Sequence, residues 1–324
     1  MTGLRVGTVE AQPGTRVYGE ILVGSLADGS AVAVPLVLIN GSSEGRRLFI
    51  QAAVHGVEVN PLESLRRVVT GLNPQEVHGQ IVAVTVANPL GFRHHDRRNI
   101  TDREDVNRVW PGRADGGLAE RIAHAIYEQA VKGADLVVDL HTGYSTMITH
   151  TVYGEGDAAS ESLARCFGTE YLIMEEQDDD WSRARFSGKL RNVANADGIP
   201  AITPELGGHS KFEGNQIQSG VMGLTNVLVR YGFIRGDVIA PHRQITIRNH
   251  LTKVTANEGG IFVATVRPGQ EVWETQELGY IYTPGDFEIV ETVRAPFDSV
   301  VVYHAENPVV NTGDTLVNLG KRGH

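Results

Sequence analysis

The sequence predicts an α/β fold in which helices flank a mixed, largely parallel sheet, followed by an all-β C-terminal domain. Up to about residue 240, short apolar runs alternate with stretches of helical periodicity, which is the pattern of strands joined by crossover helices. Beyond that point, strand patterns alternate with turns such as RPGQ, TPGD and NTGD, without helix-length periodicity. We therefore expect one domain over residues 1–242 and a β-rich domain over residues 243–324.

Apolar runs locate the strands of the first domain. Two early strands are predicted around a turn at Asp28-Gly29, a dipeptide that favours hairpins, and these strands cover residues 16–24 and 30–41. The later apolar runs are short enough for buried strands. They cover residues 48–54, 81–87, 135–140, 171–174 and 200–206.

Helical spacing of apolar residues predicts two helices between these strands. The first covers residues 60–72, and Asn60 is a suitable N-cap, so this helix should begin just after Glu58. The second covers residues 118–133, where Gly133 is the expected stop.

Composition excludes several classes of partner. The 324 residues carry a net charge of −10 and no long basic run, which argues against binding nucleic acid or an anionic membrane. Cys166 is the single cysteine, so an intrachain disulfide is excluded and a reducing compartment is favoured. The N-terminus has no apolar leader, and the longest apolar run is about half of the roughly 20 residues that span a bilayer. We therefore expect a cytoplasmic protein.

Metal-binding side chains follow two of the predicted strands. His55 comes directly after one apolar run, with Glu58 three residues later, and His141 directly follows another. Open α/β folds bind ligands at the carboxyl ends of their strands. Two histidines and a glutamate, with a fourth position open, form an established catalytic zinc set, and Asp139 could orient His141. We expect one zinc ion per chain, with polar turns around satisfied histidines as the alternative.

A further strand end supplies a carboxylate that the ligand set does not need. Glu205 closes the apolar run at 200–206 and precedes a double glycine. Such a carboxylate can take a proton from a water that attacks a carbonyl and deliver it to the leaving amine. Glu205 is therefore the predicted general base, and a helix-capping or surface acid is the alternative.

Five ordered segments, HGVE, NPLGF, DVNRVWPG, DLHTG and TPELGG, resemble the motifs of the succinylglutamate desuccinylase and aspartoacylase family of the zinc carboxypeptidase A superfamily. They lie within residues 50–208. The resemblance implies a zinc-carboxypeptidase-like fold, zinc on His55, Glu58 and His141, and Glu205 as the base.

The resemblance also implies substrate-binding roles. Asn107 and Arg108 match the family's substrate-binding pair, in which the arginine grips a carboxylate, and a planar guanidinium suits that task. Another arginine upstream polarises the scissile carbonyl in the family. Among Arg97, Arg98 and Arg103, spacing favours Arg98.

The family's substrate-selecting residue has no clear match in this sequence. Arg183, Arg185 and Lys189 are candidates. The acidic segment at residues 175–181 is either a solvated loop or a lid that meets a cationic substrate group. His209 is either a substrate contact or a surface residue.

The C-terminal region resembles the barrel-sandwich fold of biotinyl and lipoyl carrier domains, which carry their cofactor on a lysine at a hairpin tip. No lysine lies between Lys253 and Lys321, so the carrier function is excluded. The region is expected to form a wall or rim of the active site.

These features together predict a zinc-dependent amidohydrolase that deacylates a small N-acyl amino acid or a related N-acyl amine. Its partner would be that small-molecule substrate, and a homo-oligomer is left open. One alternative is a zinc carboxypeptidase that acts on peptides. Another is a non-catalytic metal-containing protein that binds a metabolite, but such a binder would need no base, and Glu205 is present.

Overall fold

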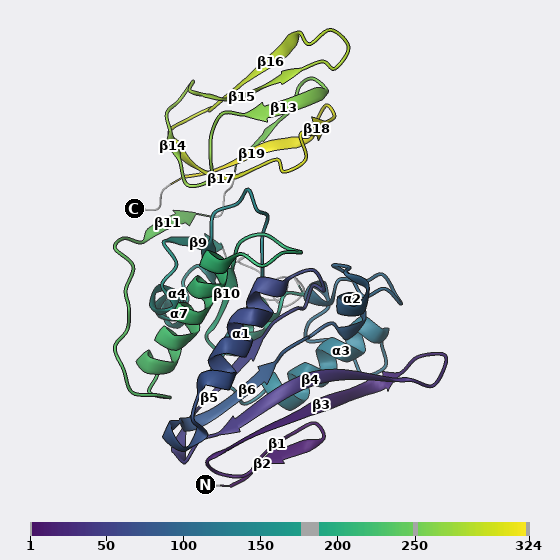
Figure 1. Ribbon diagram of the computed structural model, residues 1–324, viewed down its shortest axis with the longest axis vertical. Coiled ribbons are helices and arrows are strands. Elements are labelled where there is room, and N and C mark those ends of the chain that lie inside the picture. Colours follow the sequence, from purple (N-terminus) through teal and green to yellow (C-terminus); the bar gives the residue numbers. More distant parts are fainter. Residues whose placement is uncertain (1, 176–187, 249–251, 322–324) are drawn as a thin grey trace.

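The structure, a computed structural model, describes residues 2–175, 188–248 and 252–321. A mixed sheet forms its centre (Figure 1). The nine strands of this sheet are β3 (Thr15–Ser25), β4 (Ala31–Asn40), β5 (Ser43–Gln51), β6 (His78–Val84), β7 (Leu136–Asp139), β8 (His150–Gly154), β9 (Tyr171–Glu175), β10 (Ala201–Glu205) and β11 (Ile245–Arg248). Their order is β11-β9-β8-β10-β7-β5-β6-β4-β3, and five of the eight neighbouring pairs are parallel. The predicted mixed, largely parallel sheet is confirmed.

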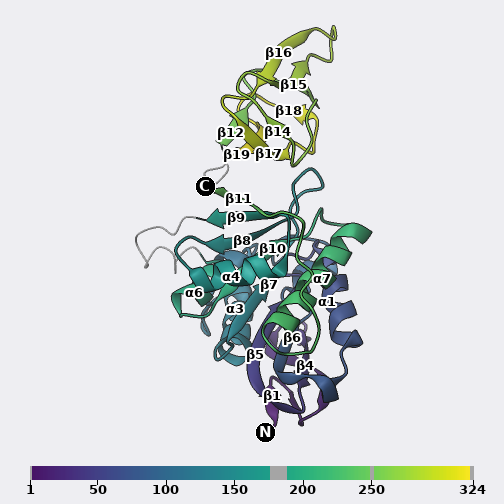
Figure 2. The ribbon, with the colours of Figure 1, turned by 90° about the vertical axis from the view of Figure 1, so that its left-hand side faces the viewer.

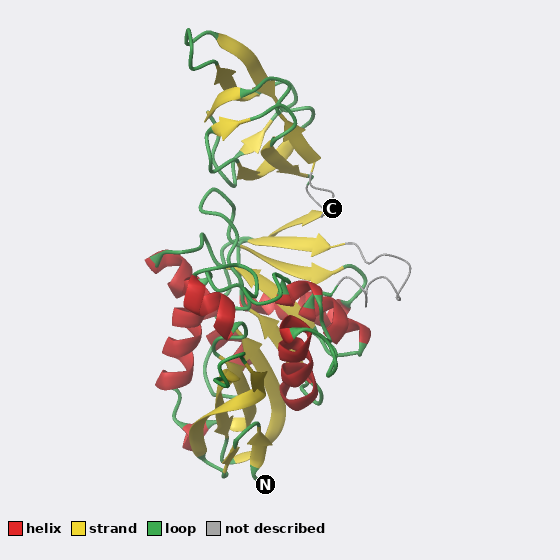
Figure 3. Ribbon diagram, turned by 90° about the vertical axis from the view of Figure 1, so that its right-hand side faces the viewer, coloured by secondary structure: helices red, strands yellow, loops and turns green. Residues whose placement is uncertain are grey.

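Helices cover both faces of this sheet (Figure 3). The α-helices are α1 (Val59–Gly71), α2 (Pro89–His94), α3 (Leu118–Ile126), α4 (Ala158–Phe167), α6 (Leu190–Ala196) and α7 (Gly214–Arg230). Shorter helical turns are η1 (Pro74–Glu76), η2 (Val106–Arg108) and η3 (Tyr127–Val131). Apolar residues of α1, α4 and α7 pack on one face, and those of α2, α3 and α6 pack on the other. None of the described helices is long and apolar enough to cross a membrane.

Strand β5 ends earlier than the sequence pattern predicts. The apolar run continues to Val54, but the strand stops at Gln51, because the chain turns at Ala53, whose φ of 50° is in the left-handed region. His55 therefore lies in a turn, as expected, but four residues after the end of β5 rather than directly after the strand.

The first helix begins where it was expected, but its cap differs. Helix α1 starts at Val59, directly after Glu58, as predicted. Asn60 is inside the helix and is not the N-cap, which corrects the prediction. Its buried side-chain amide donates to the carbonyl oxygens of Leu206 (3.0 Å) and Gly208 (3.1 Å). Asn60 thus fastens the start of α1 to the segment that follows Glu205.

The C-terminal region is all β, as predicted. It contains two four-stranded antiparallel sheets that share one apolar core. One sheet consists of β12 (Thr252–Thr255), β19 (Thr315–Gly320), β17 (Ser299–His304) and β14 (Glu271–Val272), and the other of β16 (Ile289–Arg294), β15 (Glu277–Tyr282), β13 (Gly260–Ala264) and β18 (Val309–Val310). A separate small hairpin at the N-terminus pairs β1 (Leu4–Val6) with β2 (Val9–Ala11). Because β11 pairs with β9, the large sheet extends past residue 242, and the domain boundary placed there stays a prediction.

The C-terminal sheets lie beyond the β11 edge of the large sheet (Figure 2). Main-chain hydrogen bonds join the two parts: Ile148 N donates to Val302 O (2.9 Å), and His304 N donates to Thr146 O (3.2 Å). The segment that accepts this pairing begins only five residues after His141. The C-terminal region therefore contacts the loop that leaves the predicted metal site.

Candidate metal and catalytic site

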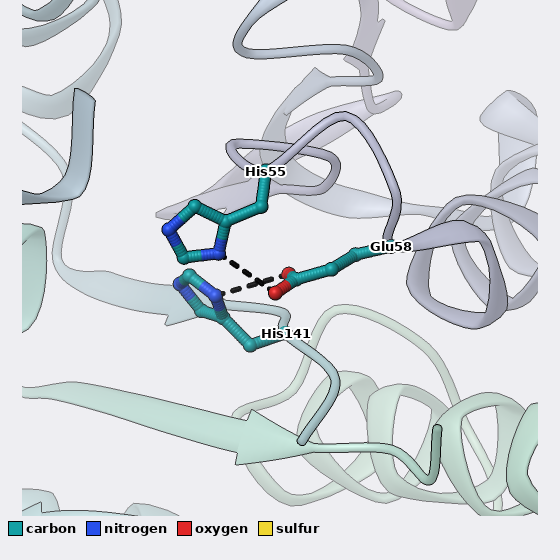
Figure 4. A group of neighbouring side chains, drawn as sticks. All are labelled: His55, Glu58 and His141. Atoms are coloured by element: carbon teal, nitrogen blue, oxygen red, sulfur yellow. Dashed lines mark hydrogen bonds and ion pairs between the residues drawn. The ribbon is translucent and has the colours of Figure 1, made fainter. Parts of the chain in front are cut away.

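His55, Glu58 and His141 come together at one edge of the large sheet. One ligand atom from each lies within 4.8 Å of the others, and all three side chains are buried. The Glu58 carboxylate lies between the imidazoles, 2.7 Å from His55 Nδ1 and 3.1 Å from His141 Nδ1. Figure 4 shows the two rings and the carboxylate facing one another.

Sheet topology explains this convergence. His55 and Glu58 lie in the turn between β5 and α1, and His141 follows β7, the parallel neighbour of β5. The carboxyl ends of parallel neighbours meet at the same edge of a sheet. The turn itself requires a glycine, because a Cβ on Gly56 would lie 2.2 Å from the backbone of Gly91.

A second carboxylate holds the far side of each imidazole. His55 Nε2 lies 3.1 Å from Asp105 Oδ1, and His141 Nε2 lies 3.2 Å from Asp139 Oδ2. Gln51 donates to the other Asp139 oxygen at 2.7 Å. This arrangement leaves both Nδ1 atoms for a metal, with each ring oriented by a carboxylate, as is usual for metal-binding histidines.

The electrostatics of the cluster favour a cation. Burial alone would lower the pKa of His55, but Glu58 and Asp105 raise that pKa above its usual value. Burial likewise opposes protonation of His141, yet Asp139 and Glu58 raise its pKa well above normal. A cluster that draws protons onto its imidazoles is short of positive charge. Two imidazoles and a carboxylate also match a zinc donor set, so the residues fit this metal.

Glu205 lies beside this cluster. It ends β10, next to β7, and its backbone pairs with that of His141. Its Oε2 atom is buried without a hydrogen-bond partner among the described residues. Burial raises the pKa of Glu205 to about 7, which suits a group that accepts and releases a proton near neutral pH.

A cavity of about 190 Å³ contains this cluster and most of the predicted substrate-binding residues. Its lining consists of His55, Glu58, Arg97, Asn107, Arg108, His141, Thr142, Val152, Glu175, Lys189, Arg191, Thr203 and Glu205. Of the residues predicted to bind metal or substrate or to act as the base, His55, Glu58, His141, Glu205, Asn107 and Arg108 lie in this lining, and Arg98 does not.

Arg97, not Arg98, faces the cavity. Arg97 Nη2 lies 3.2 Å from Asp105 Oδ2, and the other oxygen of this carboxylate contacts His55. Arg98 is exposed, and its backbone N donates to Asp96 Oδ1 (2.8 Å). Sequence spacing favoured Arg98 for the role of polarising the carbonyl, whereas the cavity lining contains Arg97 and not Arg98.

Asn107 and Arg108 lie on the same wall in η2. Asn107 is buried, and its Nδ2 atom is 3.3 Å from His141 Nε2. Arg108 Nη1 donates to the carbonyl oxygen of Asn107 (2.8 Å). Within the described chain, no carboxylate forms an ion pair with Arg108. Arg108 therefore keeps its charge for an anionic ligand.

The sequence did not indicate Arg191. Its side chain is 3% exposed, it pairs with Glu175, and its Nε atom has no partner among the described residues. Glu175 also accepts from Lys189 Nζ at 2.7 Å. The other two candidates for substrate selection, Arg183 and Arg185, and the acidic segment beyond Glu175 lie outside the described residues. No sequence pattern marked Arg191, because a charged residue in a short segment such as LRNVANA is ordinarily solvent-exposed.

His209 lies outside the cavity lining. Its ring packs on Tyr144, with 5.8 Å between ring centroids, and its Nδ1 atom is 3.2 Å from Gly143 O. Tyr144 also packs on Tyr303 of the C-terminal region at 5.0 Å. These aromatic residues link the loop after His141 to the C-terminal region.

Comparisons with known proteins identify the family of this chain. The succinylglutamate desuccinylase/aspartoacylase catalytic domain matches residues 44–231, more than half of the chain. N-alpha-acetyl-L-2,4-diaminobutyric acid deacetylase of Halomonas elongata is 26% identical over 303 residues, covering 90% of this chain and 86% of that protein. Succinylglutamate desuccinylase of Pseudomonas paraeruginosa is 27% identical over 208 residues, covering 59% of this chain and 58% of that protein.

Solved structures show the same fold. A succinylglutamate desuccinylase from Silicibacter has a TM-score of 0.84 at 21% identity, covering 95% of both chains. The product-bound ectoine utilization protein EutE from Ruegeria pomeroyi also has a TM-score of 0.84, at 23% identity, covering 94% of this chain and 95% of that one. The curated relatives are hydrolases of amide bonds in N-acyl amino acids. By the match to its catalytic domain, this chain belongs to the succinylglutamate desuccinylase/aspartoacylase family.

Proposed function

We propose that this chain is a zinc-dependent amidohydrolase that removes the acyl group from a small N-acyl amino acid. The main support is a single cavity that is lined by the possible metal ligands His55, Glu58 and His141 and also by Glu205. The buried Oε2 atom of Glu205 has no hydrogen-bond partner among the described residues. The curated relatives, a deacetylase and a desuccinylase, support the same reaction class.

The residues divide the chemistry between them. A zinc ion held by His55, Glu58 and His141 would supply a Lewis acid for the acyl carbonyl and lower the pKa of a water. Glu205 takes the proton from the attacking water and delivers it to the leaving amine. Arg97, on the same cavity wall, stabilises the negative charge that develops on the carbonyl oxygen. The sequence pattern favoured Arg98 for this role, but we assign it to Arg97, because of these two arginines only Arg97 lines the cavity.

Arg108 is the proposed anchor for a carboxylate of the substrate. It lines the cavity and forms no ion pair with a described carboxylate, so its guanidinium can form two parallel hydrogen bonds to the ligand. Asn107 supports it, since the Asn107 carbonyl accepts a hydrogen bond from Arg108.

A substrate screen tests this proposal. N-acetyl, N-formyl and N-succinyl amino acids are supplied as free acids and as carboxamides, and released amine is measured. The amides should lose about 10²-fold in kcat/KM, because they leave Arg108 without its charged partner. Equal rates for acids and amides would refute the carboxylate anchor, and no hydrolysis of any compound would refute the proposed reaction.

The peptide-cleaving alternative is tested in the same screen. A cavity of about 190 Å³ favours small substrates over extended peptides. Blocked tripeptides with free carboxyl ends should therefore be cleaved far more slowly than N-acyl amino acids. Faster cleavage of the peptides would favour a carboxypeptidase.

A further inference from the structure

Four cationic side chains line the cavity, and three of them already have a carboxylate partner. Arg97 pairs with Asp105, whereas Lys189 and Arg191 share a single acid. Only Arg108, among the described cavity cations, lacks such a pair. The cavity can therefore bind one carboxylate of a substrate at Arg108, while Glu175 cancels one of the two positive charges of Lys189 and Arg191.

Glu175 is the acid that compensates two of these cations. It ends β9, and its carboxylate lies 2.7 Å from Lys189 Nζ and contacts the guanidinium of Arg191. The Glu175 side chain is 19% exposed, so these charges are partly shielded from solvent. Burial would raise the pKa of Glu175, but Arg191 and Lys189 lower it to about 2, and the carboxylate is ionised at neutral pH.

Glu175, Lys189 and Arg191 line the same cavity as Arg108. If Arg108 binds the carboxylate common to all N-acyl amino acids, we expect this wall to meet the part that varies, either the side chain or the acyl tail. A second carboxylate there would compete with Glu175 for the same two cations and would be repelled by it. We propose that Glu175 sets the charge selectivity of the cavity by weakening its affinity for a variable group that carries a second carboxylate. The inference rests on the proposed function and names its substrate class.

The test changes the charge of Glu175 and measures selectivity. Glu175→Gln keeps the size and removes the charge, which leaves Lys189 and Arg191 uncompensated. The ratio of kcat/KM for N-acetyl-L-aspartate to that for N-acetyl-L-2,4-diaminobutyrate should rise about ten- to a hundredfold, mainly through KM. Glu170→Gln is the matched control, because Glu170 pairs with Arg243 on the surface and lies outside the cavity. It should leave the ratio unchanged.

Two substrate series identify the group that meets this wall. One varies the side chain with acetyl constant, comparing N-acetyl derivatives of aspartate, asparagine and diaminobutyrate. The other varies the acyl tail with alanine constant, comparing N-succinyl-L-alanine with N-acetyl-L-alanine. The series whose ratio changes in Glu175→Gln identifies the variable group. Unchanged ratios in both series would overturn the inference.

Further variants separate charge from support of the fold. Glu175→Asp retains the charge and should keep the wild-type ratio even if the rate falls. Lys189→Gln removes a positive charge and should shift the ratio in the opposite direction, toward diaminobutyrate. If Glu175→Gln does not fold, an unchanged ratio in Lys189→Gln would overturn the inference.

A binding measurement separates this inference from the proposed function. Calorimetric titration of the zinc-loaded protein with L-aspartate and L-2,4-diaminobutyrate reports charge selectivity without turnover. If the wild type hydrolyses none of the substrates, the proposed function fails, and the same Glu175→Gln shift in relative affinity would still support the charge selectivity. Absence of that shift would refute it.

Discussion

The large-sheet part and the C-terminal β part bury different kinds of side chain. Among the described residues, every buried polar or charged side chain except that of Ser299 lies before residue 242. The C-terminal sheets instead enclose an apolar core that includes Val301, Leu316 and Leu319. Buried polar groups destabilise a fold unless they are hydrogen bonded or bind a ligand. We therefore expect substitutions of buried polar residues in the first part to affect metal binding and catalysis, and substitutions of buried apolar residues in the second part to affect stability.

The largest expected effect is loss of the metal. His55→Ala and His141→Ala should each lower zinc from about one ion to below about 0.1 per chain, because either change leaves only two of three ligands. Metal analysis of the purified proteins measures this. His94→Ala, which changes an exposed histidine of α2, should keep its zinc. Full zinc in either site variant would remove that residue from the ligand set.

The next effect separates the base from the ligands. Glu205→Gln should retain zinc and fold normally but lose about 10²–10⁴-fold in kcat, because the amide cannot accept the proton. Steady-state kinetics and metal analysis on one preparation measure both quantities. Glu128→Gln is the control, because Glu128 lies in η3 and forms an exposed ion pair with Lys132. A loss below about tenfold would place proton transfer on another group.

A core substitution tests the C-terminal part. Leu316→Ala should lower the free energy of unfolding of that part by about 2–5 kcal/mol, because Leu316 is fully buried in an apolar core. Zinc content at 25 °C should stay unchanged, since Leu316 packs in the C-terminal core and is absent from the cavity lining. Amide hydrogen exchange of β17 and β19 under increasing denaturant measures the stability of this part, and Val309→Ala at an exposed position is the control. Zinc loss in Leu316→Ala would show that the two parts are one cooperative unit.

The smallest expected effect concerns pH. His150 is buried in β8, and burial lowers its pKa to about 4 from the usual 6.5. The unfolded chain therefore takes up this proton first, and stability present above pH 6.5 is lost as the pH falls toward 4. His150→Asn should lose about 2 kcal/mol less than wild type between pH 7.5 and pH 4.5. Equal losses in denaturant titrations would contradict this.

The sequence correctly predicted those features of the fold that depend on interactions within a few residues along the chain. Helix α1 starts after Glu58 as expected, because apolar spacing and Pro61 act within a few residues. The choice of Asn60 as its cap was wrong, because that amide bonds to carbonyls almost 150 residues away. Strand β8 was not predicted, since its pattern includes the polar Thr151, whose hydroxyl is satisfied by Thr169 (2.8 Å).

The candidate site likewise contains residues that local sequence patterns predict and residues whose position depends on tertiary contacts. His55, Glu58 and His141 follow apolar runs, so sheet topology alone predicts their convergence. The choice between neighbouring arginines 97 and 98 depends on which one reaches Asp105, a tertiary contact with no sequence signature. Arg191 was missed for the same reason, because a charged residue in a short helix is ordinarily solvent-exposed.

The junction between the two parts combines main-chain hydrogen bonds between residues 146–148 and 302–304 with a small buried apolar cluster that includes Ile148 and Val302. Every residue except proline offers the same main-chain donor and acceptor, so this pairing constrains side-chain identity very little. Substitutions that keep the cluster apolar can therefore accumulate on both segments during evolution while the register persists. Recombination between relatives could exchange the whole C-terminal region at this junction, while the cavity lining, whose described residues all precede residue 206, would stay the same.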